Sequence, residues 1–195
     1  AAFLKAVRII MLVALPFYFG LATTAEPLVL TMLGDKWAEA IPVVRLLACA
    51  MPFMTLQVLF SPACDALGRP GIGVRNGATG ALILATAFLI AVRWDAIGLG
   101  WAWIGAYPIY LGFTCWRSLP VIGASFPRMA AAIAPPLAAA SAMAAGVLLV
   151  DAQLPPLAPL FHLAVLVAVG AGIYGATLLT FARGTIMELV ALIRH

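Results

Sequence analysis

Six long runs of apolar residues, separated by short polar segments, occupy almost the whole of this 195-residue chain. A helix rises about 1.5 Å per residue, so roughly 20 apolar residues cross the hydrocarbon core of a bilayer. The runs are continuous and do not alternate with a period of two, which favours helices over the strands of a β-barrel. The pattern predicts six membrane-spanning helices over residues 9–33, 39–62, 70–92, 96–116, 128–150 and 157–182.

The composition supports this interpretation. Hydrophobic residues make up 65% of the chain and charged residues only 9%, which is too little charge to cover the surface of a soluble domain. The predicted fold class is therefore an all-α, polytopic membrane bundle. Because the loops are short, neighbouring spans are expected to pack as antiparallel hairpins. We predict a four-helix part over 1–118, an additional transmembrane hairpin over 119–182 and a cytoplasmic tail over 183–195.

Basic residues are unevenly divided between the two sides of the predicted bundle. One side has only Lys36 and Arg93, and Arg45 lies within the second span. The other side collects eight basic residues: Lys5, Arg8, Arg69, Arg75, Arg117, Arg128, Arg183 and Arg194. The positive-inside rule then predicts that both ends of this segment are cytoplasmic. The net charge of +4 thus reflects topology, and no nucleic-acid partner is expected.

Two ionisable residues lie at similar depth in adjacent spans. Glu26 comes seven residues before the end of the first span, and Arg45 comes about six residues into the second. We expect both side chains to face the same interior and to pair directly or through water. Burial of charge in a membrane costs several kcal/mol unless it is compensated, so such residues are candidates for a substrate or ion pathway. A structural ion pair that joins two helices is an equally good interpretation.

Gln57 in the second span and Asn76 in the third are further pathway candidates. Their amides can hydrogen-bond a polar ligand in a central cavity, although cross-linking of helices is the commoner role for such residues. His162 stands alone near the outer end of the sixth span, where the span begins, and is interpreted as a hydrogen-bonded interface residue.

The sequence gives no support for catalysis. Cys49, Cys64 and Cys115 have neither metal-binding nor redox spacing, and no nucleophile–base pair or cofactor motif is present. We therefore expect a protein that is not an enzyme and has neither a metal nor a cofactor.

Part of the chain resembles a known family. The residues that carry the resemblance are Leu15-Pro16-Phe17-Tyr18-Phe19-Gly20-Leu21-Ala22, Ala25-Glu26-Pro27-Leu28-Val29, Leu33-Gly34-Asp35-Lys36-Trp37-Ala38-Glu39-Ala40, Pro42 and Arg45-Leu46-Leu47-Ala48. They are similar to the later half of polysaccharide (O-antigen/oligosaccharide) flippases of the Wzx type, in the multidrug/oligosaccharidyl-lipid/polysaccharide (MOP) exporter superfamily. The similarity is good over residues 12–75, weaker through about 117 and only hydropathic afterwards.

The resemblance implies a transporter built from two pseudo-symmetric helical bundles around a cavity, as in the MOP and MATE-like proteins. This chain resembles the C-terminal part, the last six of fourteen helices, and its N-terminal half is then missing. The implied activity moves undecaprenyl-pyrophosphate-linked oligosaccharide from the cytoplasmic to the periplasmic leaflet of the bacterial inner membrane, for surface polysaccharide such as lipopolysaccharide. The implied partners are this lipid-linked oligosaccharide, membrane lipids and the missing half. Arg45 is then the first candidate to contact the anionic substrate, and Glu26 the candidate for ion or proton coupling.

Three alternatives remain open. One is a multidrug or peptidoglycan-precursor exporter of the same fold, and another is a membrane enzyme acting on lipid-linked sugars, for which convergent carboxylates or histidines in a loop are lacking. The third is a non-catalytic helical membrane subunit. That alternative predicts that Glu26 and Arg45 contact only each other, with no cavity beside them.

Overall fold

The computed structural model describes residues 2–155 and 158–181, and all its regular elements within these ranges are helices. They are α1 (Ala2–Thr23), α2 (Ala25–Met32), the 3-10 helix η1 (Asp35–Ala40), α3 (Ile41–Val58), α4 (Phe60–Asp65), α5 (Pro70–Ala91), the 3-10 helix η2 (Val92–Trp94), α6 (Asp95–Ile122), α7 (Phe126–Asp151) and α8 (Pro159–Phe181). The predicted all-helical membrane fold is confirmed. The predicted tail over 183–195, with Arg183 and Arg194, lies outside the described residues.

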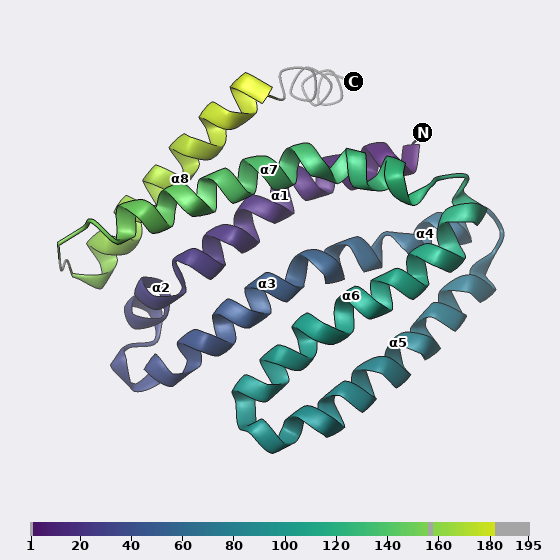
Figure 1. Ribbon diagram of the computed structural model, residues 1–195, viewed down its shortest axis with the longest axis horizontal. Helices are drawn as coiled ribbons and strands as arrows, with labels where there is room; N and C mark the ends of the chain where they lie inside the picture. Colours follow the sequence, from purple (N-terminus) through teal and green to yellow (C-terminus); the bar gives the residue numbers. More distant parts are fainter. Residues whose placement is uncertain (1, 156–157, 182–195) are drawn as a thin grey trace.

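Five helical stretches within the described residues are long and apolar enough to cross a membrane. The third, Pro70–Ile122, has 53 residues and reverses at η2, so α5 and α6 lie side by side as a hairpin (Figure 1). With this hairpin counted as two helices, the described chain has six long helices at positions close to the six predicted spans. The first helix differs most, because α1 begins at Ala2 instead of residue 9.

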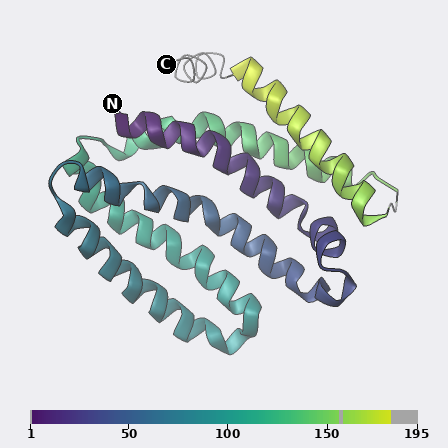
Figure 2. The same ribbon diagram turned by 180° about the vertical axis from the view of Figure 1, so that it is seen from behind.

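The long helices form an open row in which each packs on the next, in the order α8, α7, α1, α3, α6 and α5. Within it, α7 and α1 overlap in both views (Figures 1 and 2). α7 packs most extensively against α1, and α3 packs against both α1 and α6. The main apolar core lies along these contacts and includes Val7, Met11, Phe60 and Leu111. The hairpin predicted over 119–182 thus packs directly on the first part of the chain through α1, and its status as a separate unit stays a prediction.

The predicted first span is divided in two at Thr24. Pro27 has no amide hydrogen to donate to the carbonyl of Thr23, so regular helical bonding cannot continue through this point. At this point the Gly20 carbonyl accepts from the Thr24 amide at 2.9 Å, from the Thr24 hydroxyl at 2.8 Å and from the Thr23 hydroxyl at 3.0 Å. The chain therefore bends, and α2 leaves the axis of α1 (Figure 1).

A second proline perturbs α1 near its middle. Pro16 cannot donate to the carbonyl of Leu12, the acceptor one turn earlier in the helix. The hydroxyl of Tyr174 on α8 donates to this carbonyl at 2.6 Å. A backbone acceptor left by a local kink is thus satisfied by a side chain 162 positions away in the sequence.

We expect Tyr174→Phe to lower the free energy of unfolding by about 0.5–1.5 kcal/mol, because it removes the hydrogen bond to the freed carbonyl. In a Pro16→Ala background the helix regains its own donor, so the same change should cost less. Unfolding in detergent, measured for the four chains of this double-mutant cycle, checks the prediction. Tyr110→Phe is the control, since the Tyr110 hydroxyl has no hydrogen bond within the described residues. Equal costs of Tyr174→Phe in both backgrounds would contradict it.

The reversal between α5 and α6 depends on a glycine. A Cβ added at Gly98 would collide with the carbonyl oxygen of Ala91, which belongs to the backbone and cannot rotate away. Gly98→Ala should therefore destabilise the protein by about 1–3 kcal/mol. Gly105→Ala on the same helix meets open space and should be neutral or stabilising. Thermal unfolding of the two variants in one detergent compares them, and a similar loss of stability in both would argue against the prediction.

Candidate functional site

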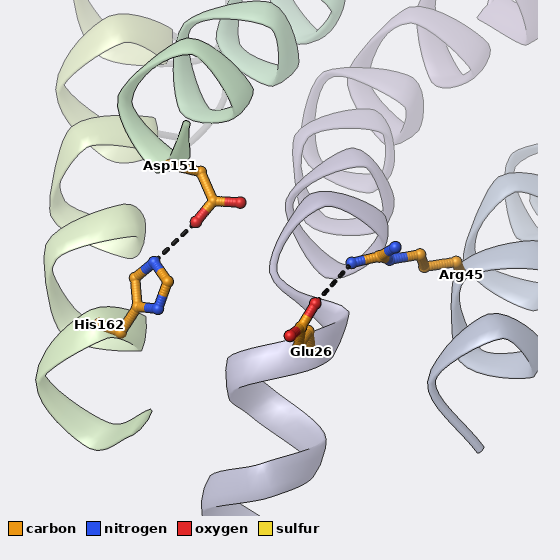
Figure 3. A network of polar contacts seen from close by, with 4 residues as sticks. All are labelled: Glu26, Arg45, Asp151 and His162. Carbon is orange, nitrogen blue, oxygen red and sulfur yellow. Dashed lines mark hydrogen bonds and ion pairs between the residues drawn. The ribbon is translucent and has the colours of Figure 1, made fainter. Parts of the chain in front are cut away.

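Glu26 and Arg45 are brought together by the turn through η1. Glu26 is in the first turn of α2, and Arg45 is near the start of α3. Arg45 Nη2 lies 3.4 Å from Glu26 Oε2, so the side chains form an ion pair with a hydrogen bond (Figure 3). The direct contact expected from their similar depth is present. Their role in a substrate or ion pathway stays a prediction.

The pair is open on one side. The side chains of Arg45 and Glu26 are 48% and 59% exposed, so the described helices do not enclose them. That both side chains face the interior of a bundle stays a prediction, because the described helices form an open row. An Arg guanidinium has five N–H donors, so the single contact to Glu26 leaves donors free for an anionic group.

A second hydrogen-bonded pair, Asp151 with His162, lies at the same end of the long helices as Glu26 and Arg45. Asp151 ends α7, and His162 lies in the first turns of α8. His162 Nε2 is 2.6 Å from Asp151 Oδ1, and the two side chains are 25% and 35% exposed (Figure 3). The Glu26 helix α2 also packs against the His162 helix α8, so the two pairs lie on neighbouring helices.

The sequence interpretation of His162 was partly right. It predicted a hydrogen bond and missed the partner. The signal was available, because Asp151 closes one predicted span and His162 opens the next, and an antiparallel hairpin places such positions at the same level.

Asn76 belongs to a different region. Its Nδ2 donates to the Ser118 hydroxyl at 3.0 Å, and both residues are buried. This bond links α5 to α6, which favours the cross-linking interpretation of Asn76. Its Oδ1 is buried and has no hydrogen-bond partner among the described residues.

Gln57 is also separate from the ion pair. It lies near the end of α3, roughly 18 Å along the helix from Arg45. Its Oε1 is buried without a hydrogen-bond partner in the described part of the chain. Of the four predicted pathway residues, the structure therefore brings together only Glu26 and Arg45.

Most of the described basic residues lie at the other end of the long helices, away from Glu26–Arg45 and Asp151–His162. Lys5 and Arg8 begin α1, Arg69 precedes α5, and Arg128 begins α7. Arg117 Nη1 donates to Thr79 Oγ1 at 2.7 Å, a further link between α5 and α6. The two-sided division of charge predicted from the sequence is present in the described chain. Which side faces the cytoplasm stays a prediction from the positive-inside rule.

The N-terminal elements match a known protein family. Residues 1–42 match the family described as "Polysaccharide biosynthesis protein". The match covers α1, α2 and η1, with Glu26, and ends before Arg45. No curated protein and no solved structure matches the chain. Together with the apolar helices, the family match supports a multi-pass membrane protein of polysaccharide biosynthesis.

We expect the Glu26–Arg45 pair to contribute little to stability. A half-exposed ion pair typically contributes about 0.2–1 kcal/mol, because solvent screens the charges. Unfolding of Glu26→Gln, Arg45→Gln and the double variant in detergent gives the coupling free energy. Asn76→Ala, which breaks a buried interhelical bond, serves as the reference variant. A coupling above about 2 kcal/mol would identify the pair as a structural lock instead.

Proposed function

We propose that the protein is part of a membrane transporter that moves a lipid-linked oligosaccharide, an undecaprenyl-pyrophosphate glycan, from the cytoplasmic to the periplasmic leaflet. The translocated oligosaccharide serves the synthesis of surface polysaccharide. In this proposal the protein lies in the inner membrane of a bacterium, and both ends of this segment are in the cytoplasm. The observation that carries the proposal is the family match over residues 1–42 in a chain of membrane-spanning helices. The resemblance of residues 12–75 to Wzx-type flippases of the MOP superfamily supports the finer assignment.

The composition suits this task. Moving a lipid across a bilayer requires no bond chemistry, and it needs a polar path for sugar and pyrophosphate beside an apolar flank for the lipid tail. Charged groups at membrane depth are costly and are kept where they serve a polar path. Glu26 and Arg45 are charged groups at membrane depth. Of the two paired sites in the described part of the chain, theirs is the more exposed and thus the more open to a ligand.

Arg45 suits the binding of pyrophosphate. Its guanidinium is planar and permanently charged, and it can bind two phosphate oxygens at once. In the proposed cycle the pyrophosphate replaces Glu26 as the partner of Arg45. Glu26 is then free to take up a coupling ion or a proton. The exchange is feasible because the 3.4 Å contact is long for a charged hydrogen bond and its side chains are half exposed.

The row of helices supports a partnership with a second half. Both edge helices have little of their surface covered, since the buried residues are Asn76, Gly80 and Ala91 in α5 and Leu166 and Gly170 in the described part of α8. In the proposed transporter, the other half completes the cavity wall that Glu26 and Arg45 face. Membrane lipids cover the remaining apolar surface.

One observation favours a second candidate. Within the described residues, the side chains of Glu26 and Arg45 make a polar contact with each other and with no further group. A non-catalytic helical subunit predicts this same contact as a link between α2 and α3. An exporter for drugs or peptidoglycan precursors remains the alternative within the same fold, with a different cargo.

Complementation tests the proposed function. The chain within its full reading frame is expressed in a flippase-deficient bacterium, and surface polysaccharide is scored beside Arg45→Ala, Arg45→Lys and Glu26→Gln. We expect restored polysaccharide with the native chain and at least a tenfold loss with Arg45→Ala, since a charged contact to phosphate contributes about 1.5–3 kcal/mol. Arg45→Lys keeps the charge and should lose less.

Membrane insertion of every variant is measured in parallel, with Arg93→Gln as a control that removes one positive charge from the same predicted side. Normal activity in both Arg45→Ala and Glu26→Gln would reduce the pair to a helix link. Failure of the native chain despite normal insertion would move the assignment to the exporter or the subunit.

A further inference from the structure

A cationic groove lies between α1 and α7, at the end of these helices away from Glu26–Arg45 and Asp151–His162. It has a volume of about 370 Å³ and is lined by Leu4, Lys5 and Arg8 of α1 and by Arg128, Ala131 and Ala132 of α7. The spacing explains the arrangement, because residues three and four positions apart share one face of a helix. Each helix therefore turns one face toward the groove, and the small alanines leave room between the basic side chains.

The positive charge in this groove has no acidic partner in the described residues. The Glu26–Arg45 and Asp151–His162 pairs of the described chain involve other residues and lie at the opposite end of the long helices. Arg8 is half-buried, whereas Lys5 and Arg128 are exposed. Arg128 also lies in the first turn of α7, where the helix dipole adds partial positive charge. Three like charges around one groove repel each other unless an anion binds between them.

An apolar groove adjoins the cationic one. It has a volume of about 670 Å³, and its walls include Phe3, Leu59 and Ile122. Leu4 and Arg128 line both grooves, so the two surfaces meet at these side chains. The combination of a cationic pocket and an adjoining apolar channel matches an amphiphile with a phosphate head and a hydrocarbon tail.

We propose that these two grooves bind an anionic glycerophospholipid. Its phosphate lies among Lys5, Arg8 and Arg128, and one acyl chain lies along Phe3, Leu59 and Ile122. Basic pockets between helices on the cytoplasmic side of membrane proteins bind anionic headgroups in this manner. The bound lipid joins α1 to α7, the most extensive helix contact of the row. The inference goes beyond the proposed transport activity and does not depend on it, because the ligand is a bilayer lipid and not the cargo.

The test measures lipid-dependent stability of the purified chain in neutral detergent. Dioctanoyl phosphatidylglycerol is titrated, and the midpoint of thermal unfolding gives the apparent affinity. Dioctanoyl phosphatidylcholine, inorganic phosphate and farnesyl diphosphate are titrated in parallel. The test variant is Arg8→Gln/Arg128→Gln. The matched control is Arg69→Gln/Arg75→Gln. It removes two positive charges from the same end of the helices, as the test variant does, but none from the groove.

Phosphatidylglycerol should raise the unfolding midpoint of the native chain, and phosphatidylcholine and inorganic phosphate should not. The groove variant should bind about 25-fold more weakly, at about fivefold per cation removed, while the control keeps native affinity. Arg8→Lys/Arg128→Lys preserves charge and should retain most of the effect, which separates lost binding from lost folding. An equal loss in the control would overturn the proposal in favour of general surface charge. Stronger stabilisation by farnesyl diphosphate would overturn it in favour of an isoprenyl cargo.

Discussion

The hydrogen-bonding demand of the peptide backbone governs this structure, because the hydrocarbon core of a bilayer offers no water to satisfy a free carbonyl. Pro16 releases such a group, the carbonyl of Leu12, and the Tyr174 hydroxyl on α8 donates to it. At the bend before α2, the hydroxyls of Thr23 and Thr24 add hydrogen bonds to carbonyls in the last turn of α1. The first bond acts between helices far apart in the sequence. A kink that is local in origin thus helps to place α8 against α1.

Most of the helix positions follow from the sequence because span length is a local property set by bilayer thickness. The prediction over 70–92 agrees closely with α5, and that over 128–150 with α7. The start of α1 was missed because Lys5 and Arg8 were treated as flanking charges, although long basic side chains extend a helix into the headgroup layer. Pro27 indicates a disturbed helix beside Glu26, but the division of the span at Thr24 was not predicted, since hydropathy does not report how a proline redirects the chain.

The candidate sites divide in the same way. Glu26 and Arg45 were paired correctly from sequence because both belong to one hairpin, whose geometry fixes relative depth. The groove of Arg8 and Arg128 was not predicted, because it depends on α7 returning to pack against α1. Charge counting assigned both residues to one side of the membrane. It contains no information on which helices on that side are neighbours.

The two ends of the long helices differ in how their charge is compensated, and this difference connects the two proposals. Glu26–Arg45 and Asp151–His162 are paired internally, so a ligand must displace a partner to bind there. Lys5, Arg8 and Arg128 have no acidic partner among the described residues, so in the proposed site an anion would displace no described contact. Exchange of partners suits a site that must bind and release cargo, whereas uncompensated charge suits lasting contact with a lipid. The two sites lie along one segment of the chain, because α1 begins in the groove and is followed, after the bend at Thr24, by α2 with Glu26.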